Sequence, residues 1–251
     1  MAASLLTRLR LKLARRLWPH VSAEPWPLNP TYLGDGLLTE HGSDFLQDER
    51  FLRSYAAGKA TGSWWNHDLH WRAYVVCWAA MQGRSLPGDF VECGVHRGGY
   101  SRMLAEYVAL DELPEKRLFL FDTFSGIPDR YRNTPSARIF DGVYEDSYQD
   151  VVQTFARYQN AVPIRGIVPD VLPEANIEQV CFLSIDLNSP EPSVAATEYF
   201  WPKMTRGAAV VFDDYNFRFF ADQKVALDEF AARAGVQILS LPTGQGLLIK
   251  S

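Results

Sequence analysis

The chain has 251 residues, 47% hydrophobic and 22% charged, a composition typical of one globular domain with extensions and a buried core of its own. Its net charge is −5, and the first 20 residues carry five basic and no acidic side chains, so the remainder carries −10 and a broad nucleic-acid-binding face is not expected. No apolar run reaches membrane-spanning length, and three cysteines without metal-ligand spacing indicate reduced thiols and a cytoplasmic protein.

The N-terminal stretch, residues 1–30, predicts a basic amphipathic helix followed by a linker. Leucines recur at every fourth position from Leu5 to Leu17 among arginines and a lysine, and arginines interrupt the apolar stretch that a secretory signal would need. Three roles stay open for residues 1–20: peripheral contact with an anionic membrane, an organellar presequence, or a helix that packs against a partner. Prolines in residues 18–30 favour an extended linker.

Residues 31–85 predict a helical cap laid over the main domain. A first helix is expected at residues 45–55, opened by Ser43, and a second at residues 67–82, capped by Asn66. His70 lies near the start of the second helix, where it can act as a base, contact a ligand or simply lie on the surface.

Residues 86–251 alternate between strand-like and helix-like segments, which favours a parallel sheet covered by helices on both faces. A Pro-Thr-Gly-Gln turn near the C-terminus predicts a closing antiparallel hairpin and hence seven strands. The expected strands are 89–93, 117–121, 162–165, 181–185, 208–212, 236–241 and 246–250, and the expected helices include 101–108, 148–158, 190–200 and 221–234.

The stretch from residue 88 to residue 101, GDFVECGVHRGGYS, predicts a strand, a glycine turn and a helix start. Glycines permit close backbone approach, and a helix N-terminus offers free N–H groups to a ligand. The spacing does not match a dinucleotide fingerprint, and a purely structural strand-to-helix connection is the alternative. The predicted cofactor contacts in this stretch are Glu92, Gly94, Gly98 and Ser101.

Two further positions favour a nucleoside-like ligand. Asp122 closes the second strand, where a carboxylate can accept hydrogen bonds from both hydroxyls of a ribose, although a turn aspartate is the alternative. Gly166 follows the third strand and lets a planar base lie against the backbone. Between them, residues 125–146 show no clear period, which is typical of lids and substrate loops, and a disordered segment without a role is the alternative.

Acidic side chains end the next two strands. Asp186 follows strand 181–185, with Asn188 two residues later, and Asp213 and Asp214 follow strand 208–212. Parallel strands end at one edge of the sheet, so we expect these oxygens to converge and to repel one another unless a cation or a proton intervenes. Mg²⁺ takes oxygen ligands of this kind, and a metal-free network is the alternative.

Several motifs carry a family resemblance. They are FVECGVHRGGYSRML, LFDTFSGIP, LSIDLNSPEPSVAATEYFWPKM, AAVVFDDY and SLPTGQGLLIK. Together they resemble the macrocin O-methyltransferase-like family of class I S-adenosylmethionine-dependent methyltransferases, from about residue 66 to the C-terminus. The resemblance implies a Rossmann-like doubly wound α/β fold. It also implies cofactor contacts at Glu92, Gly94, Gly98, Asp122, Gly166 and Asp186, and metal ligands at Asp186, Asp213 and Asp214.

The sequence departs from this family in one run. Many members have a histidine and a second aspartate in an HIDxD run, whereas this chain reads SIDLN, so Asn188 would coordinate a metal through its carbonyl oxygen, with less charge.

The expected activity is methyl transfer from S-adenosylmethionine, assisted by Mg²⁺, to a hydroxyl group of a small molecule or sugar. Asp186 and His70 are the two candidates for the general base. A metal-dependent nucleotide-sugar enzyme and a non-catalytic protein with a methyltransferase fold are the alternatives, and homodimer formation is left open.

Overall fold

The computed structural model describes residues 30–140 and 142–251, and the chain divides into two compact units, Met1–Asp44 and Phe45–Ser251. The predicted helix of residues 1–20 and nearly all of the linker lie outside the described residues. In the described part of the first unit, strands β1 (Tyr32–Gly34) and β2 (Leu37–Thr39) form an antiparallel hairpin that the sequence analysis did not predict. No helix in the described residues is long and apolar enough to cross a membrane.

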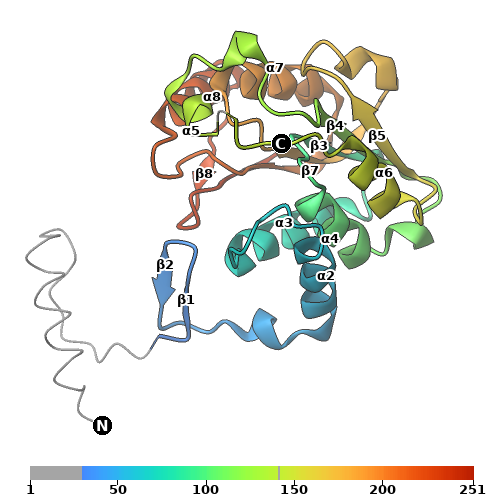
Figure 1. Cartoon of the computed structure of the whole chain (residues 1–251), viewed down its shortest axis with the longest axis vertical. Coiled ribbons are helices and arrows are strands. Elements are labelled where there is room, and N and C mark those ends of the chain that lie inside the picture. Colours follow the sequence, from blue (N-terminus) through green and yellow to red (C-terminus); the bar gives the residue numbers. More distant parts are fainter. Residues whose placement is uncertain (1–29, 141) are drawn as a thin grey trace, which may run out of the picture. The chain divides into compact units, whose positions relative to one another are not determined.

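A seven-stranded sheet organises the second unit, with the strand order β5-β4-β3-β6-β7-β9-β8 (Figure 1). The first five strands along the chain pair in parallel, and β9 pairs antiparallel with both β7 and β8. The predicted fold class, including the closing hairpin, is thereby confirmed. The strands are β3 (Asp89–Cys93), β4 (Leu118–Asp122), β5 (Ala161–Arg165), β6 (Val180–Ile185), β7 (Met204–Phe212), β8 (Leu239–Ser240) and β9 (Gly246–Ile249).

Alternate side chains of the buried strands divide between two apolar clusters, one on each face of the sheet. In β3, Phe90 belongs to one cluster and Val91 to the other, and both are fully buried. This alternation is the period of a strand, and burial on both faces makes the strand continuously apolar. The first cluster includes side chains of α2 (Glu49–Lys59), α3 (His70–Gly83), α4 (Gly99–Tyr107) and α6 (Tyr148–Phe155), and the second includes those of α7 (Pro190–Phe200) and α8 (Ala221–Ala234).

The two helices of the predicted cap lie in the same compact unit as the sheet, where α2 packs on α4 and α3 packs on β7 and α4. Their predicted starts are wrong. A short 3-10 turn follows Ser43, and α2 begins after Asp48, whose Oδ1 accepts a hydrogen bond from the Phe51 N–H at 2.9 Å. Successive turns carry the chain past Asn66, so α3 begins after Leu69 without a side-chain cap.

The segment from residue 125 to residue 146 contains two short helices, a 3-10 turn (Asp129–Tyr131) and α5 (Pro135–Ile139). Helices of this length are too short to leave a period in the sequence, so they could not be predicted from it. Ile127, Tyr131 and Ala137 form a small apolar cluster of their own, which gives the segment a defined structure.

The path of the chain creates a topological switch point at the carboxyl edge of the sheet. After β3 the chain runs outward to β4 and β5, then returns to place β6 on the other side of β3. Ligands of open α/β sheets bind at such a switch point. Gly94, just past β3, lies against the start of the loop after β6, where a Cβ added to Gly94 would meet the Asp186 carbonyl oxygen at 1.8 Å.

We expect Gly94→Ala to be far more destabilising than Gly235→Ala. Both glycines have a left-handed backbone (φ +90° and +68°), but nothing lies within 4 Å of a Cβ built on Gly235. Gly235→Ala should lower the free energy of unfolding by about 1 kcal/mol, the cost of the backbone conformation, and Gly94→Ala by more than about 3 kcal/mol. Urea unfolding of both variants measures this, and equal losses would contradict the close approach.

Candidate functional site

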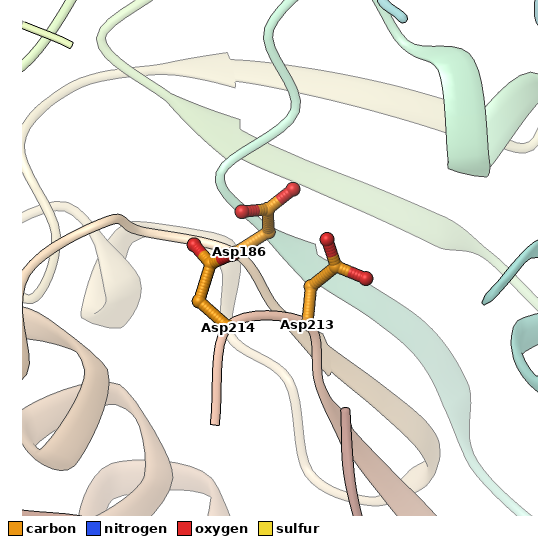
Figure 2. A group of neighbouring side chains, drawn as sticks. All are labelled: Asp186, Asp213 and Asp214. Atoms are coloured by element: carbon orange, nitrogen blue, oxygen red, sulfur yellow. The ribbon is translucent and has the colours of Figure 1, made fainter. Parts of the chain in front are cut away.

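Three carboxylates meet at the carboxyl edge of the sheet (Figure 2). Asp186 follows β6, and Asp213 and Asp214 follow β7; the pairing of Ile185 with Phe212 brings the two strand ends level. One oxygen from each of the three carboxylates lies within 4.8 Å of the others. Asp213 and Asp214 are buried, whereas Asp186 is partly exposed.

The Asp213 carboxylate accepts hydrogen bonds from two segments that are distant in the sequence. Arg72 of α3 donates from Nη1 to its Oδ2 at 2.8 Å, and Gln245 of the closing hairpin donates from Nε2 to its Oδ1 at 2.9 Å. All three residues are buried, so this ion pair is shielded from water and salt. The sequence analysis placed Gln245 in a turn and did not anticipate either contact.

Asp186 and Asp214 are not neutralised in this way. Asp214 Oδ2 is buried without a hydrogen-bond partner. Burial, and then the charge of Asp213, raises the pKa of Asp214 to about 7. Burial and the charges of Asp213 and Asp214 raise the pKa of Asp186 well above its usual range. An unpaired carboxylate oxygen beside two more carboxylates fits a hard divalent cation, which takes ligands of this type.

Asn188 lies beside this cluster with a left-handed backbone (φ +53°). Its Nδ2 donates to the hydroxyl oxygen of Tyr144 at 3.2 Å, so its Oδ1 stays available as an acceptor. Tyr144 belongs to the segment between β4 and α6, and the sequence analysis did not predict that it reaches the carboxylate edge.

Strand β3 carries a buried carboxyl group close to the loop that follows it. Glu92 is 3% exposed, and the Ser101 hydroxyl of α4 donates a hydrogen bond to it. Burial raises the pKa of Glu92 to about 8. Gly98 caps α4 with φ +86°, and a Cβ there would lie 2.8 Å from the Phe155 ring, so packing alone requires a glycine at this position.

Asp122 holds the same loop. Its Oδ2 accepts hydrogen bonds from the backbone N–H groups of Val95 and His96 at 2.6 and 2.7 Å, and its Oδ1 accepts one from Phe124 at 2.7 Å. Asp122 therefore has a structural role in holding the backbone around it. Its contact with ribose hydroxyls stays a prediction. Asp122 is partly exposed and retains lone pairs for a ligand.

A cavity of about 570 Å³ lies between the loops that follow β4 and β5. Gly166 lines it, and a Cβ at Gly166 would lie 2.7 Å from Val171, so its contact with a planar base stays a prediction. The other lining residues are Thr123, Ser125, Gly126, Ile127, Pro128, Asp129, Arg130, Arg132, Arg165 and Ile167.

His70 is not a member of the carboxylate group in the described residues. Its ring stacks on Tyr55 with the ring centroids 4.3 Å apart, and burial lowers its pKa. Of the two predicted general bases, Asp186 is the one that the structure places at the carboxylate edge.

Residues 72–238 match the sequence model of the macrocin O-methyltransferase family. Among curated proteins, the chain is 27% identical over 167 residues to demethyldecarbamoylnovobiocin O-methyltransferase of Streptomyces niveus, covering 62% of this chain and 63% of that protein. It is 26% identical over 170 residues to a Streptomyces olivaceus 4'-O-methyltransferase that acts on a rhamnosyl tetracenomycin, covering 64% of each. The matches thus span less than two thirds of these relatives.

Solved structures show the same fold. The O-methyltransferase NovP is 23% identical with a TM-score of 0.64, over 72% of this chain and 79% of that chain. The calicheamicin methyltransferase CalS11 is 17% identical with a TM-score of 0.55, over 99% of this chain and 94% of that chain.

The buried Glu92 should make the ligand-free protein less stable as the pH rises. The folded-state pKa of Glu92, about 8, lies above the ordinary value of 4.5, so folding takes up a proton between these values. The stabilisation is complete below about pH 4.5 and is lost as the pH rises through about 8. From pH 5 to pH 8, the free energy of unfolding of wild type should therefore fall relative to Glu92→Gln by on the order of 3–4 kcal/mol.

Urea unfolding in chelator at four pH values between 5 and 8 measures this difference. Glu106→Gln is the control: although burial opposes it, hydrogen bonding with Arg102 lowers the pKa of Glu106, so this variant should run parallel to wild type over the same range. Parallel profiles for Glu92→Gln and wild type would show that Glu92 does not hold a proton.

Proposed function

The chain belongs to the macrocin O-methyltransferase family, and we propose that it transfers a methyl group from S-adenosylmethionine to a hydroxyl group of a sugar or other small molecule. The observation that carries the proposal is the junction of two features at the switch point of the sheet. The glycine loop after β3 and the partly exposed Asp186 after β6 adjoin, and the Asp186 N–H donates to the Cys93 carbonyl oxygen at 2.8 Å. A cofactor site and an acidic site can thus share one crevice.

The residues present fit the cofactor. S-adenosylmethionine supplies a methyl group on a sulfonium sulfur, open to in-line displacement by an oxygen nucleophile. Gly94, Gly98 and the start of α4 would lie beside its methionine part, and the cavity lined by Thr123 and Gly166 would hold its adenosine. These groups come from three strand ends that the sheet holds rigidly, which is what alignment of two reactants requires.

The residues also fit a magnesium ion. Asp186, Asp213 and Asp214 would hold it, with the Asn188 carbonyl oxygen as a further ligand, and the unpaired Asp214 oxygen is the observation behind this proposal. Bound Mg²⁺ supplies Lewis acidity that lowers the pKa of a coordinated hydroxyl group. Asp186, which lies at the edge of the carboxylate cluster, would accept the proton of the acceptor hydroxyl.

The lid, which we define as residues 126–146, would keep water from the transfer. Its C-terminal end is tied to the sheet edge, because Asp146 pairs with Arg165 of β5 at 2.5 Å and Glu145 pairs with Arg97 of the glycine loop at 3.5 Å. In α5, the Ser136 hydroxyl donates to Asp222 of α8 at 3.0 Å. A cytoplasmic location, membrane contact through residues 1–20 and a homodimer remain predictions.

S-adenosylmethionine should bind with a micromolar dissociation constant in calorimetry. Ser125 lines the cavity between the β4 and β5 loops, and Ser125→Trp should weaken binding at least tenfold by filling it. Ser85→Trp, at an exposed serine after α3, is the control and should bind as wild type does. Tight binding of a UDP-sugar without any binding of S-adenosylmethionine would refute the proposed activity in favour of a nucleotide-sugar enzyme.

Asp214→Asn should weaken Mn²⁺ binding at least tenfold, because it removes a charged oxygen ligand while keeping the shape of the side chain. Paramagnetic titration with Mn²⁺ as the Mg²⁺ probe measures the affinity, and calorimetry should show nearly unchanged binding of S-adenosylmethionine. Asp228→Asn is the matched control, since Asp228 pairs with Lys224 on the surface of α8. If Asp214→Asn binds Mn²⁺ as tightly as wild type, Asp214 is not a metal ligand. If wild type itself does not bind Mn²⁺, the carboxylate cluster is a metal-free network.

A further inference from the structure

Three aromatic rings from distant segments meet beside the glycine loop. They belong to Trp65 in the turn before α3, His96 in the glycine loop and Tyr144 in the lid. The ring centroids lie 5.4 Å apart for Trp65 and His96, 4.9 Å for His96 and Tyr144, and 6.3 Å for Trp65 and Tyr144. Trp65 and His96 both have left-handed backbones (φ +49° and +52°), a conformation that non-glycine residues adopt mostly in turns and at functional sites.

This aromatic wall, the rings of Trp65, His96 and Tyr144, leads from the carboxylates to the surface. At the inner end the Tyr144 hydroxyl accepts a hydrogen bond from Asn188, two residues after Asp186. At the outer end the Trp65 side chain is 48% exposed, a large fraction for an indole ring.

A ring-shaped acceptor with several hydroxyls has the complementary chemistry. The C–H groups on one face of a pyranose pack against an aromatic ring, and its hydroxyls need polar partners at its edge. The wall offers the exposed Trp65 ring for the first purpose. For the second it offers the Tyr144 hydroxyl, whose oxygen already accepts from Asn188 and whose proton is free to donate.

Resting on the proposed function, we propose that Trp65, His96 and Tyr144 form the acceptor subsite, in which a pyranose ring stacks on Trp65 and presents a hydroxyl to the carboxylates. Trp65 sets the preference for a sugar ring, and Tyr144 donates a hydrogen bond to a ring hydroxyl. His96 supports both rings, because Asp122 fixes its backbone N–H at 2.7 Å.

The test uses methyl α-L-rhamnopyranoside as the probe and saturation-transfer-difference NMR on the full chain, with and without S-adenosylhomocysteine. Wild type should transfer saturation to the ring protons of the sugar. Trp65→Ala should reduce the transfer at least fivefold, Trp65→Phe should retain most of it, and Tyr144→Phe should weaken it through loss of the hydroxyl. Trp78→Ala is the matched control, because Trp78 lies on α3 and is 42% exposed, and it should behave as wild type does.

Other outcomes would overturn the subsite. Equal saturation transfer in wild type and Trp65→Ala would do so, as would binding of catechol, an aromatic diol, in place of the rhamnoside. If calorimetry shows that Trp65→Ala weakens S-adenosylmethionine binding as much as it weakens binding of the rhamnoside, the aromatic wall belongs to the cofactor site instead. The two proposals can fail separately. Absence of S-adenosylmethionine binding to wild type refutes the proposed methyl transfer, whereas the NMR experiment measures binding of the rhamnoside and does not depend on methyl transfer.

Discussion

Mutual repulsion among carboxylates at the carboxyl edge of the sheet is the constraint around which the second unit is arranged. The ends of β6 and β7 force Asp186, Asp213 and Asp214 within 4.8 Å of one another. Arg72 reaches Asp213 because α3 packs directly on β7, and Gln245 reaches it because β9 pairs with β7. The early helix and the closing hairpin thus both supply partners to one buried charge, and breaking such a pair is costly.

The acidic side chains near the carboxyl edge of the sheet are stabilised in different ways, and the difference separates structural from functional groups. Asp213 has an ion pair, and Asp122 has three backbone N–H donors. Glu92 has a hydroxyl donor and a pKa of about 8, so it keeps a proton near neutral pH. Asp214 has an oxygen without any partner. The charge of Arg72 partly offsets the burial of Asp214, but a buried carboxylate oxygen without a hydrogen-bond partner still indicates a missing ligand.

The strands and the converging acids could be predicted because both follow from local patterns. Apolar runs ending in aspartate mark strands, and parallel strands end at one edge, so Asp186 and Asp213 had to be neighbours. The partners of these acids could not be predicted, since Arg72 and Asp213 are 141 residues apart and no local pattern links them. The Tyr144 contact with Asn188 escaped for the same reason. Ser43 was a plausible cap, but an intervening 3-10 turn moved that role to Asp48.

The glycines of the loop after β3 are weaker evidence for a cofactor site than their sequence pattern suggests. A side chain at Gly94 would collide with the Asp186 backbone, and one at Gly98 with Phe155, so the fold requires both glycines with or without a ligand. What distinguishes this loop from an ordinary connection is its surroundings. Asp122 fixes its backbone, and the strand order places the ends of β4 and β5, whose loops line the cavity, on one side of β3 and the partly exposed Asp186 after β6 on the other. A fixed backbone between a cavity and an accessible acid is a preorganised site, and preorganisation of this kind is what methyl transfer requires of a protein.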